Sequence, residues 1–252
     1  MVKKKRKHGG HYCKVCGCHK SNESFSGRGH ALHICKECQS LPKDEQADMM
    51  RCNEVERAAF RFPMRRQDWE LLEKYAKGRR VLNMFCYTGG FSVYAMRGGA
   101  QLVHSVDSSA KAIDLTNANI GLNFPDDKRH EAFTEDAFRF LSHIGHEQNY
   151  DLIVLDPPAF AKHKDAIRNA IKGYTRLNTI ALQKIEKGGI LFTFSCSQAV
   201  DKEQFRLAVF TAAAISGRHV RILHQLHQPA DHPINIYHPE GEYLKGLVLY
   251  VE

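Results

Sequence analysis

The stretch Tyr150–Ala159, which reads YDLIVLDPPA, decides the fold. Leu152–Leu155 is a continuous apolar run that is too short for a helix, and polar residues bound it. Such a run is typical of a strand that is buried on both faces of a parallel sheet. Asp156, Pro157 and Pro158 then end the strand in a stiff, extended turn. One carboxylate is therefore held at the carboxyl end of a central strand, where open α/β sheets bind ligands.

Strands and helices alternate on both sides of this stretch. We expect further strands over Val81–Cys86, Leu102–Val106, Glu131–Thr134, Ile190–Phe194, Val220–Leu226 and Leu247–Val251. We expect helices over Gln67–Lys77, Phe91–Arg97, Ser108–Asn119, Ala137–Ile144, Asp165–Glu186 and Lys202–Ser216. This alternation predicts an α/β fold of the Rossmann-like kind, with a doubly wound, mostly parallel sheet of seven strands.

Glycines and an acid follow the first two predicted strands. Gly89 and Gly90 allow a tight strand-to-helix turn in which backbone N–H groups approach a ligand. Asp107 can accept hydrogen bonds from ribose hydroxyls, or it can cap the following helix, and the two roles are compatible. Because the turn is not GxGxxG, a dinucleotide site is less favoured. Together with Asp156, the pattern fits a methyltransferase domain that uses S-adenosylmethionine.

Cys196 lies between two serines, directly after the fifth predicted strand. Strands one, four and five meet at the topological switch point, so Gly89, Asp156 and Cys196 should converge. A thiolate that adds to carbon 6 of a pyrimidine makes carbon 5 able to attack a methyl sulfonium. Asp156 could hydrogen-bond the N3 edge of that base. We expect the pocket to lower the pKa of Cys196, so that the thiolate forms near neutral pH.

Two CxxC pairs, formed by Cys13, Cys16, Cys35 and Cys38, precede this domain. Their spacing matches four-cysteine zinc sites, and roughly 40 residues cannot bury a sufficient core without such a metal. Nearby residues could substitute as ligands, namely Cys18, His19, His30 and His33. The sequence thus predicts a structural zinc ion, which would serve either nucleic-acid contact or stapling alone.

Positive charge is concentrated in the first third of the chain. The 252 residues carry a net charge of +8, and residues 1–80 contain 19 Lys and Arg against 10 Asp and Glu. Such a basic segment beside a neutral domain favours RNA as a partner. We expect a basic disordered tail (1–10), a zinc-knuckle segment (11–41), a linker (42–66) that is helical over Lys43–Phe60, and the methyltransferase domain (67–252).

Three features favour a cytoplasmic protein. No apolar run reaches the ~18 residues of a membrane span. The basic run Lys3–Lys7 is not followed by a hydrophobic segment, so it is not a secretory signal. Eight cysteines could indicate disulfides, but their spacing favours metal binding and catalysis in a reducing compartment.

Five segments carry a resemblance to a known family. NMFCYTGGF, VDSSAKAIDLTNANIGLN, YDLIVLDPPAFAKHK, GGILFTFSCS and ADHPINIYHPEGEYLKG resemble the ribosomal RNA large subunit methyltransferase I family, over about Tyr75–Glu252. Those enzymes make 5-methylcytosine in 23S rRNA. The resemblance implies Cys196 as the nucleophile and Asp156 as the substrate contact. It also implies S-adenosylmethionine contacts at Asn83, Phe85, Tyr87, Thr88, Gly89, Gly90, Asp107, Ser108, Asp136, Asp156 and Pro157.

The N-terminus departs from the family pattern. Members usually carry a PUA-type RNA-binding domain and a β-hairpin extension, whereas this chain has the zinc-knuckle segment, and Phe62–Asp68 does not match the family's entry to the domain. Two alternatives therefore stay open. One is methylation of a guanine or an exocyclic nitrogen, and the other is a non-catalytic zinc-knuckle RNA-binding protein. The sequence leaves the oligomeric state open, with a dimer as one option.

Overall fold

The structure is a computed structural model that describes residues 10–50, 67–145, 148–161, 166–229, 232–238 and 241–252. The chain divides into two compact units, Met1–Met64 and Arg65–Glu252. The expected basic tail, apart from its last residue, and the expected linker over 51–66 lie outside the described residues. Of the helix expected over Lys43–Phe60, residues 43–50 are helical and the remainder lies outside as well.

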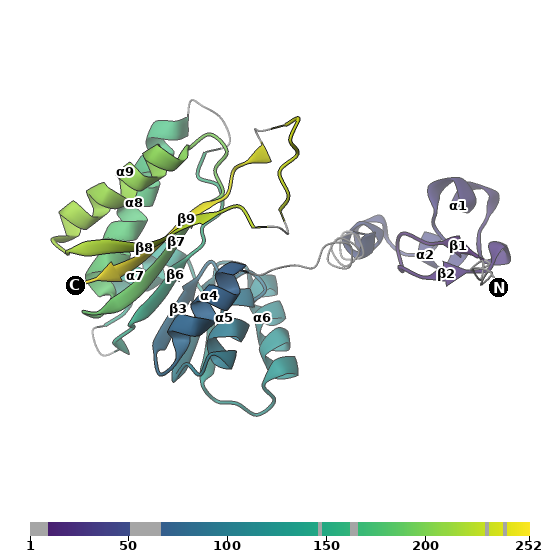
Figure 1. The fold of residues 1–252 in the computed structure, drawn as a ribbon. Coiled ribbons are helices and arrows are strands. Elements are labelled where there is room, and N and C mark those ends of the chain that lie inside the picture. Colours follow the sequence, from purple (N-terminus) through teal and green to yellow (C-terminus); the bar gives the residue numbers. More distant parts are fainter. Residues whose placement is uncertain (1–9, 51–66, 146–147, 162–165, 230–231, 239–240) are drawn as a thin grey trace, which may run out of the picture. The chain divides into compact units, whose positions relative to one another are not determined.

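The larger unit is built on one seven-stranded sheet, as predicted (Figure 1). Its strands are β3 (Arg80–Met84), β4 (Leu102–Asp107), β5 (His130–Thr134), β6 (Leu152–Leu155), β7 (Gly189–Ser195), β8 (Val220–His227) and β9 (Lys245–Val251). Their order is β5-β4-β3-β6-β7-β9-β8. The first five are parallel, whereas β9 pairs antiparallel with both β7 and β8. Strand order reverses between β3 and β6, which makes their carboxyl ends the ligand-binding edge.

Helices cover both faces of this sheet. The helices α4 (Gln67–Ala76), α5 (Gly90–Arg97) and α6 (Ala110–Asn123) lie on one face, and α7 (Ala137–His143), α8 (Ile167–Lys184) and α9 (Lys202–Ser216) lie on the other (Figure 1). Successive residues of β3 alternate between the two cores: Val81 packs on the first side and Leu82 on the second. Burial on both faces explains why the central strands read as continuous apolar runs.

Several expected boundaries were wrong by one to four residues, and two of them concern the site. The first strand ends at Met84 and not at Cys86, because Phe85 and Tyr87 adopt left-handed backbone with φ of 59° and 49°. The helix after β4 begins at Ala110, and its cap is Ser109, whose side chain accepts from the Ala112 N–H at 3.3 Å. Asp107 is therefore not the cap of that helix.

The smaller unit is a short two-stranded ribbon with three helical turns. Strands β1 (His11–Tyr12) and β2 (His19–Lys20) pair antiparallel, and η1 (Asn22–Ser24), α1 (Gly27–Leu32) and α2 (Lys36–Gln39) follow. Its core consists of three cysteines with one valine, one phenylalanine and one isoleucine: Cys13, Cys35, Cys38, Val15, Phe25 and Ile34. So few apolar side chains provide little hydrophobic stabilisation, and a further source of folding free energy is needed.

In the part of the chain that the structure describes, every helix is too short or too polar to cross a bilayer.

Candidate active site and metal centre

A cavity of about 890 Å³ opens at the carboxyl ends of the parallel strands. A volume of this size suits a nucleoside-sized ligand with room for a second reactant. Eight of the predicted site residues line it: Phe85, Tyr87, Asp107, Ser108, Asp136, Asp156, Pro157 and Cys196. They come from the turns after β3, β4, β5, β6 and β7, so the parallel sheet gathers them at one edge.

Asp107 organises the turn after β3. One carboxylate oxygen accepts from the Tyr87 N–H at 3.1 Å, and the other accepts from the Ser109 N–H at 2.9 Å. Each carboxylate oxygen has a further lone pair, so the side chain can accept hydroxyl groups of a ligand in the cavity as well. The left-handed backbone at Tyr87 directs its N–H to this acceptor, which links the first two strands across the site.

The remaining predicted cofactor residues, Asn83, Thr88, Gly89 and Gly90, are not among the residues that line the cavity. Asn83 is buried, and its amide nitrogen donates to Ser92 Oγ at 2.9 Å. The Thr88 carbonyl accepts from the Asn119 amide at 2.8 Å. These hydrogen bonds join the loop after β3 to α5 and α6.

The two glycines of the loop are required for packing. Gly89 has a φ of 80°, and a Cβ there would lie 2.7 Å from Thr116 Cγ2. A Cβ at Gly90 would lie 2.3 Å from the Trp69 ring. The close approach predicted for these glycines is thus made to α6 and α4, and Gly89 does not converge with Asp156 and Cys196 on the cavity surface.

Asp136 combines a structural contact with a place in the cavity wall. Its side chain caps α7 by accepting from the Arg139 N–H at 3.0 Å. It also lines the cavity next to Phe138. A helix N-terminus stabilises such a carboxylate, so the side chain is fixed where a ligand could donate to it.

Asp156 lines the cavity, and its side chain is exposed to it. The density of protein around the cavity, which partly desolvates the carboxyl, and secondarily the charge of Asp68 raise the pKa of Asp156 to about 6, while His232 acts in the opposite direction. At neutral pH a much larger fraction of this carboxyl is therefore protonated than of an ordinary aspartate. A group whose pKa lies this close to neutrality is suited to acid–base work.

Cys196 lies in the same cavity, and its thiol donates to the Pro157 carbonyl at 3.6 Å. Burial and the charge of Asp156 raise the pKa of Cys196, whereas Lys245 opposes them. The expectation of a lowered pKa was therefore wrong, because the pocket removes water from the thiol and places a carboxylate beside it. The thiol is the ground state, and a thiolate needs a proton acceptor.

Hydrogen bonds fix the turn that carries Cys196. The Tyr174 hydroxyl, from α8, bonds Ser197 Oγ at 2.8 Å and accepts from Ser195 Oγ at 2.9 Å. Ser197 Oγ also accepts from the Ala161 N–H at 3.3 Å, which belongs to the turn after Asp156. Ser197 is thus tied to the turn after Asp156, and both serines that flank the cysteine are tied to α8 through Tyr174.

Several wall residues had not been assigned to the site from the sequence. They include Trp69 from α4, Phe160, and the residues His232, Tyr243 and Lys245 from the loop and strand after β8. Gln228 fixes this loop, since its amide donates to the carbonyls of His232 and Gly241 and accepts from the Tyr243 and Leu244 N–H groups. The one available signal was a lysine at the start of the otherwise apolar strand KGLVLYV.

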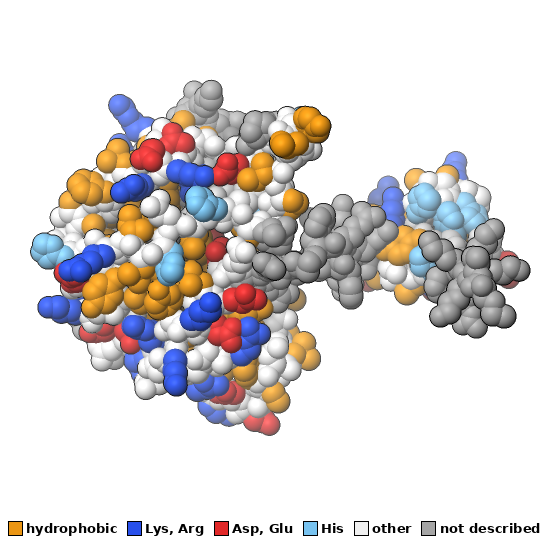
Figure 2. Space-filling model, viewed as in Figure 1, with side chains coloured by type: hydrophobic (Ala, Val, Ile, Leu, Met, Phe, Trp, Pro, Cys, Tyr) orange, Lys and Arg blue, Asp and Glu red, His pale blue; other side chains and the backbone are white. Residues whose placement is uncertain are grey.

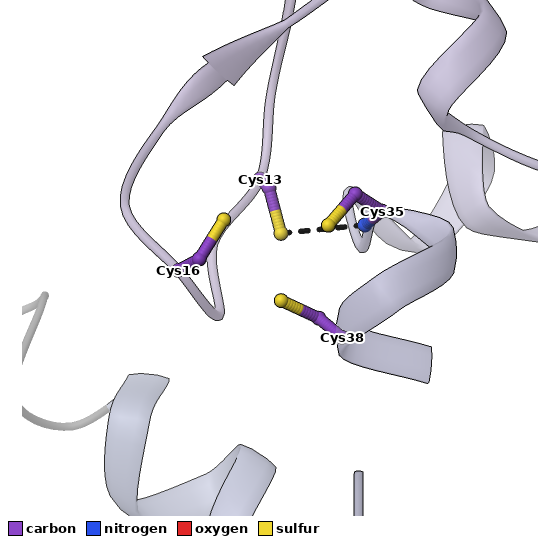
Figure 3. A group of neighbouring side chains, drawn as sticks. All are labelled: Cys13, Cys16, Cys35 and Cys38. Atoms are coloured by element: carbon purple, nitrogen blue, oxygen red, sulfur yellow. Dashed lines mark hydrogen bonds between the residues drawn. The ribbon is translucent and has the colours of Figure 1, made fainter. Parts of the chain in front are cut away.

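The four paired cysteines converge in the smaller unit (Figure 3). The sulfurs of Cys13, Cys16, Cys35 and Cys38 all lie within 4.8 Å of one another. A tetrahedral zinc ion with bonds of about 2.3 Å requires sulfurs about 3.8 Å apart, so the cluster fits that ion with a small contraction. Among the described residues, this group contains neither Cys18 nor the histidines that had been considered as substitutes.

One of these thiols is prepared to ionise. The backbone N–H of Cys35 donates to Cys13 Sγ at 3.3 Å (Figure 3). Burial raises the pKa of Cys13, but backbone N–H groups of Cys16, Cys35 and Val15 outweigh it and lower the pKa to about 6. A thiolate is the form that ligates zinc.

A doubly wound sheet with an acid after its second strand and a large cavity at the switch point defines a Rossmann-like methyltransferase domain. A family model described as S-adenosylmethionine-dependent methyltransferase matches residues 53–237. The chain belongs to this family of S-adenosylmethionine-dependent methyltransferases.

Curated relatives confirm the resemblance that the five segments indicated. "Ribosomal RNA large subunit methyltransferase I" of Aeromonas hydrophila is 43% identical over 73% of this chain and 47% of the relative. The protein of the same name from Tolumonas auensis is 46% identical over 70% of this chain and 45% of the relative. The chain thus spans about half the length of the curated relatives it matches.

Solved structures agree with this family. A structure from Streptococcus mutans assigned to the SAM-dependent methyltransferases has a TM-score of 0.65 and 26% identity, over 74% of this chain and 48% of that one. A second, assigned as a methyltransferase and complexed with SAH, has a TM-score of 0.65 and 27% identity, over 75% of this chain and 50% of that one.

Proposed function

We propose that this chain transfers a methyl group from S-adenosylmethionine to carbon 5 of a cytosine in RNA, namely 23S rRNA, through a covalent adduct at Cys196. The observation that carries the proposal is one cavity that contains both a cysteine and an aspartate whose pKa is about 6. The names of the relatives support ribosomal RNA as the substrate.

The cofactor would occupy the part of the cavity between the turns after β3, β4 and β5. Tyr87, Asp107, Ser108 and Asp136 line that part, and Asp107 has the free acceptor capacity that ribose hydroxyls need. S-adenosylmethionine, when bound, supplies an electrophilic methyl group on a sulfonium.

The chain's own residues would activate the base. The thiol proton of Cys196 passes to the Asp156 carboxylate, and the thiolate forms a bond to carbon 6 of the cytosine. Asp156 donates that proton to N3, which keeps the adduct neutral, and carbon 5 becomes the nucleophile that takes the methyl group. A base then removes the carbon 5 proton, the bond between carbon 6 and sulfur breaks, and N3 returns its proton to Asp156.

The electrostatic attraction of RNA would come mainly from basic residues outside the described part of the zinc-knuckle segment. Residues 10–50 contain five Lys and Arg and five Asp and Glu, so the excess positive charge of the first third belongs mainly to 1–9 and 51–66. Figure 2 shows basic and acidic side chains interspersed over the visible face of the larger unit. Basic residues outside the described ranges would therefore supply most of the salt-dependent affinity.

Nucleoside analysis tests the reaction. Incubation of unmodified 23S rRNA with the chain and S-adenosylmethionine is expected to produce 5-methylcytidine. The rival, transfer onto a guanine or an exocyclic nitrogen, is favoured by the raised pKa of Cys196, and a methylated nitrogen as the only product would establish it. A chain that fails to bind the cofactor would instead be the non-catalytic RNA-binding protein.

Replacing Asp107 by alanine is expected to weaken cofactor binding. Loss of charge-assisted hydrogen bonds to ribose hydroxyls costs about 1.5–3 kcal/mol, or roughly 10- to 150-fold in Kd. Calorimetry with SAH measures this. The matched control is Ser109→Ala, which removes the α6 cap but leaves the cavity wall intact; it should lower stability by about 1 kcal/mol without changing affinity. Equal effects of the two variants would contradict a ligand contact at Asp107.

The pH profile of methyl transfer should be nearly flat from about pH 6 to the raised pKa of Cys196. The reactive state has a Cys196 thiolate and a protonated Asp156. Above about pH 6 the protonated fraction of Asp156 falls about tenfold for each pH unit, while the thiolate fraction of Cys196 rises about tenfold, so the product of the two fractions stays constant. In Asp156→Asn no carboxylate can take the thiol proton. The residual kcat/KM should then rise about tenfold for each pH unit through neutrality. A flat profile in that variant would exclude the proton transfer.

A further inference from the structure

Lys245 is a buried cation beside the proposed nucleophile. It is only 8% exposed, although lysines are almost never buried to this degree without a partner of opposite charge. It begins β9 and lines the same cavity as Cys196. Burying an ammonium is costly, so its position calls for a compensating interaction and, in a cavity, indicates a role.

The compensating interaction is with the turn that carries Cys196. Lys245 Nζ donates to the Ser197 carbonyl at 2.8 Å and to the Val200 carbonyl. In the described part of the chain no carboxylate forms an ion pair with it; the exposed ion pair close by joins Lys202 to Glu242. The ammonium of Lys245 is therefore stabilised by the dipoles of backbone carbonyls, which leave its positive charge unneutralised.

Other contacts hold this turn without bringing a charge to it. Tyr174 bonds the flanking serines through a neutral hydroxyl, and Ala161 contributes a backbone N–H. Position alone could thus be maintained without a lysine. What Lys245 adds is a positive charge at the side of the cavity where Cys196 lies.

The charges that face Cys196 oppose one another. Burial and the Asp156 charge raise the pKa of Cys196, and Lys245 lowers it. Burial lowers the pKa of Lys245, whereas Cys196, Asp201 and Glu242 raise it and Lys202 lowers it. Further titratable groups at this place are the Tyr174 hydroxyl and the cavity-lining side chains of His227, His232 and Tyr243. Lys245 is buried and acts on Cys196, whereas Lys202 is exposed and acts on Lys245.

We propose that Lys245 is a positioning residue for Cys196, whose ammonium fixes the carbonyls of the cysteine turn and stabilises the thiolate against the Asp156 carboxylate. Its catalytic meaning rests on the proposed function, but the state of the thiol can be measured without methyl transfer. The thiol proton leaves to solvent in the measurement below and to Asp156 in the reaction.

Alkylation by iodoacetamide as a function of pH reports the thiolate of Cys196. Trypsin releases Gly188–Lys202, or Gly188–Arg206 where Lys202 is replaced, and Cys196 is the single cysteine in either peptide, so mass spectrometry follows this thiol alone. In Lys245→Met and Lys245→Gln the rate at pH 8 is expected to fall about tenfold or more, with the profile displaced to higher pH. SAH calorimetry on each variant establishes that the cavity is folded.

Two controls separate charge from position. Lys202→Met removes an exposed cation close to Lys245, and Tyr174→Phe removes neutral hydrogen bonds to the same turn; both should leave the alkylation profile within about twofold of the parent. An unchanged profile in the Lys245 variants would overturn the proposal, and so would an equal displacement in Tyr174→Phe. Full activity of Cys196→Ala would refute the covalent mechanism but would leave the Lys245 measurement standing.

Discussion

Replacing Cys196 by alanine is expected to reduce methyl transfer to RNA by about a thousandfold or more, since the described lining of the cavity contains no second thiol that could add to carbon 6. The fold should persist, because the thiol makes a single long hydrogen bond, to the Pro157 carbonyl at 3.6 Å. Affinity for SAH should therefore match the parent. RNA that contains 5-fluorocytidine should trap the parent protein, because fluorine at carbon 5 cannot leave as a proton.

The trapped complex gives the decisive readout. It should survive denaturing electrophoresis with the parent and with Cys18→Ser, which changes an exposed cysteine of the other unit. It should be absent with Cys196→Ala and with RNA that contains ordinary cytidine. Methyl transfer by Cys196→Ala at the parent rate would refute the covalent adduct and would favour a nitrogen as the methyl acceptor.

Removal of the metal is expected to unfold the smaller unit. We propose that its four cysteines bind one zinc ion, and structural zinc contributes an apparent 10–16 kcal/mol or so to folding in small domains. The core of the smaller unit provides little hydrophobic stabilisation without the metal, because its buried non-cysteine side chains are Val15, Phe25 and Ile34. Metal analysis should give about one zinc per chain, and Cys38→Ser should lose it together with protection from proteolysis over residues 10–50.

Cys18→Ser is the matched control for this experiment. Cys18 is exposed and lies outside the four-sulfur cluster, so that variant should retain both zinc and protection. SAH binding should survive in Cys38→Ser, because the larger unit has its own two cores. A metal-free protein whose residues 10–50 remain protected would refute the zinc site.

The sheet could be predicted because the sequence of each central strand shows both its burial and its end. Leu152–Leu155 is apolar throughout since both of its faces are covered, and turns with Gly, Asp or Pro follow the strands. The insertion of β9 between β7 and β8 could not be predicted, because the apolar pattern of a strand does not encode its neighbour. Family membership rests on the comparisons, which also agree with the resemblance of the five segments.

The site was harder to predict than the fold, for reasons visible at single residues. Asn83 is in a motif but is buried and does not line the cavity, because β3 is covered on both faces. The pKa of Cys196 depends on Asp156 and Lys245, which are 40 or more positions away in the chain. The place of each residue after a strand predicted most of the residues that line the cavity. The effect of one charge on another depends on distances that only the folded chain determines.

The antiparallel strand β9 has a consequence for how activity is acquired during folding. The turn that would bind the cofactor lies between β3 and α5 and is bonded to Asp107 at the end of β4, the next strand along the chain. Lys245 reaches the cysteine turn only when β9 has entered between β7 and β8, where Gly189 pairs with Val251. Contacts across such long chain separations form late, because closing the intervening loop costs entropy. The contact that would activate the thiol, from Lys245 to the Ser197 carbonyl, thus spans 48 positions of the chain, whereas the contact from Tyr87 to Asp107 in the cofactor turn spans 20.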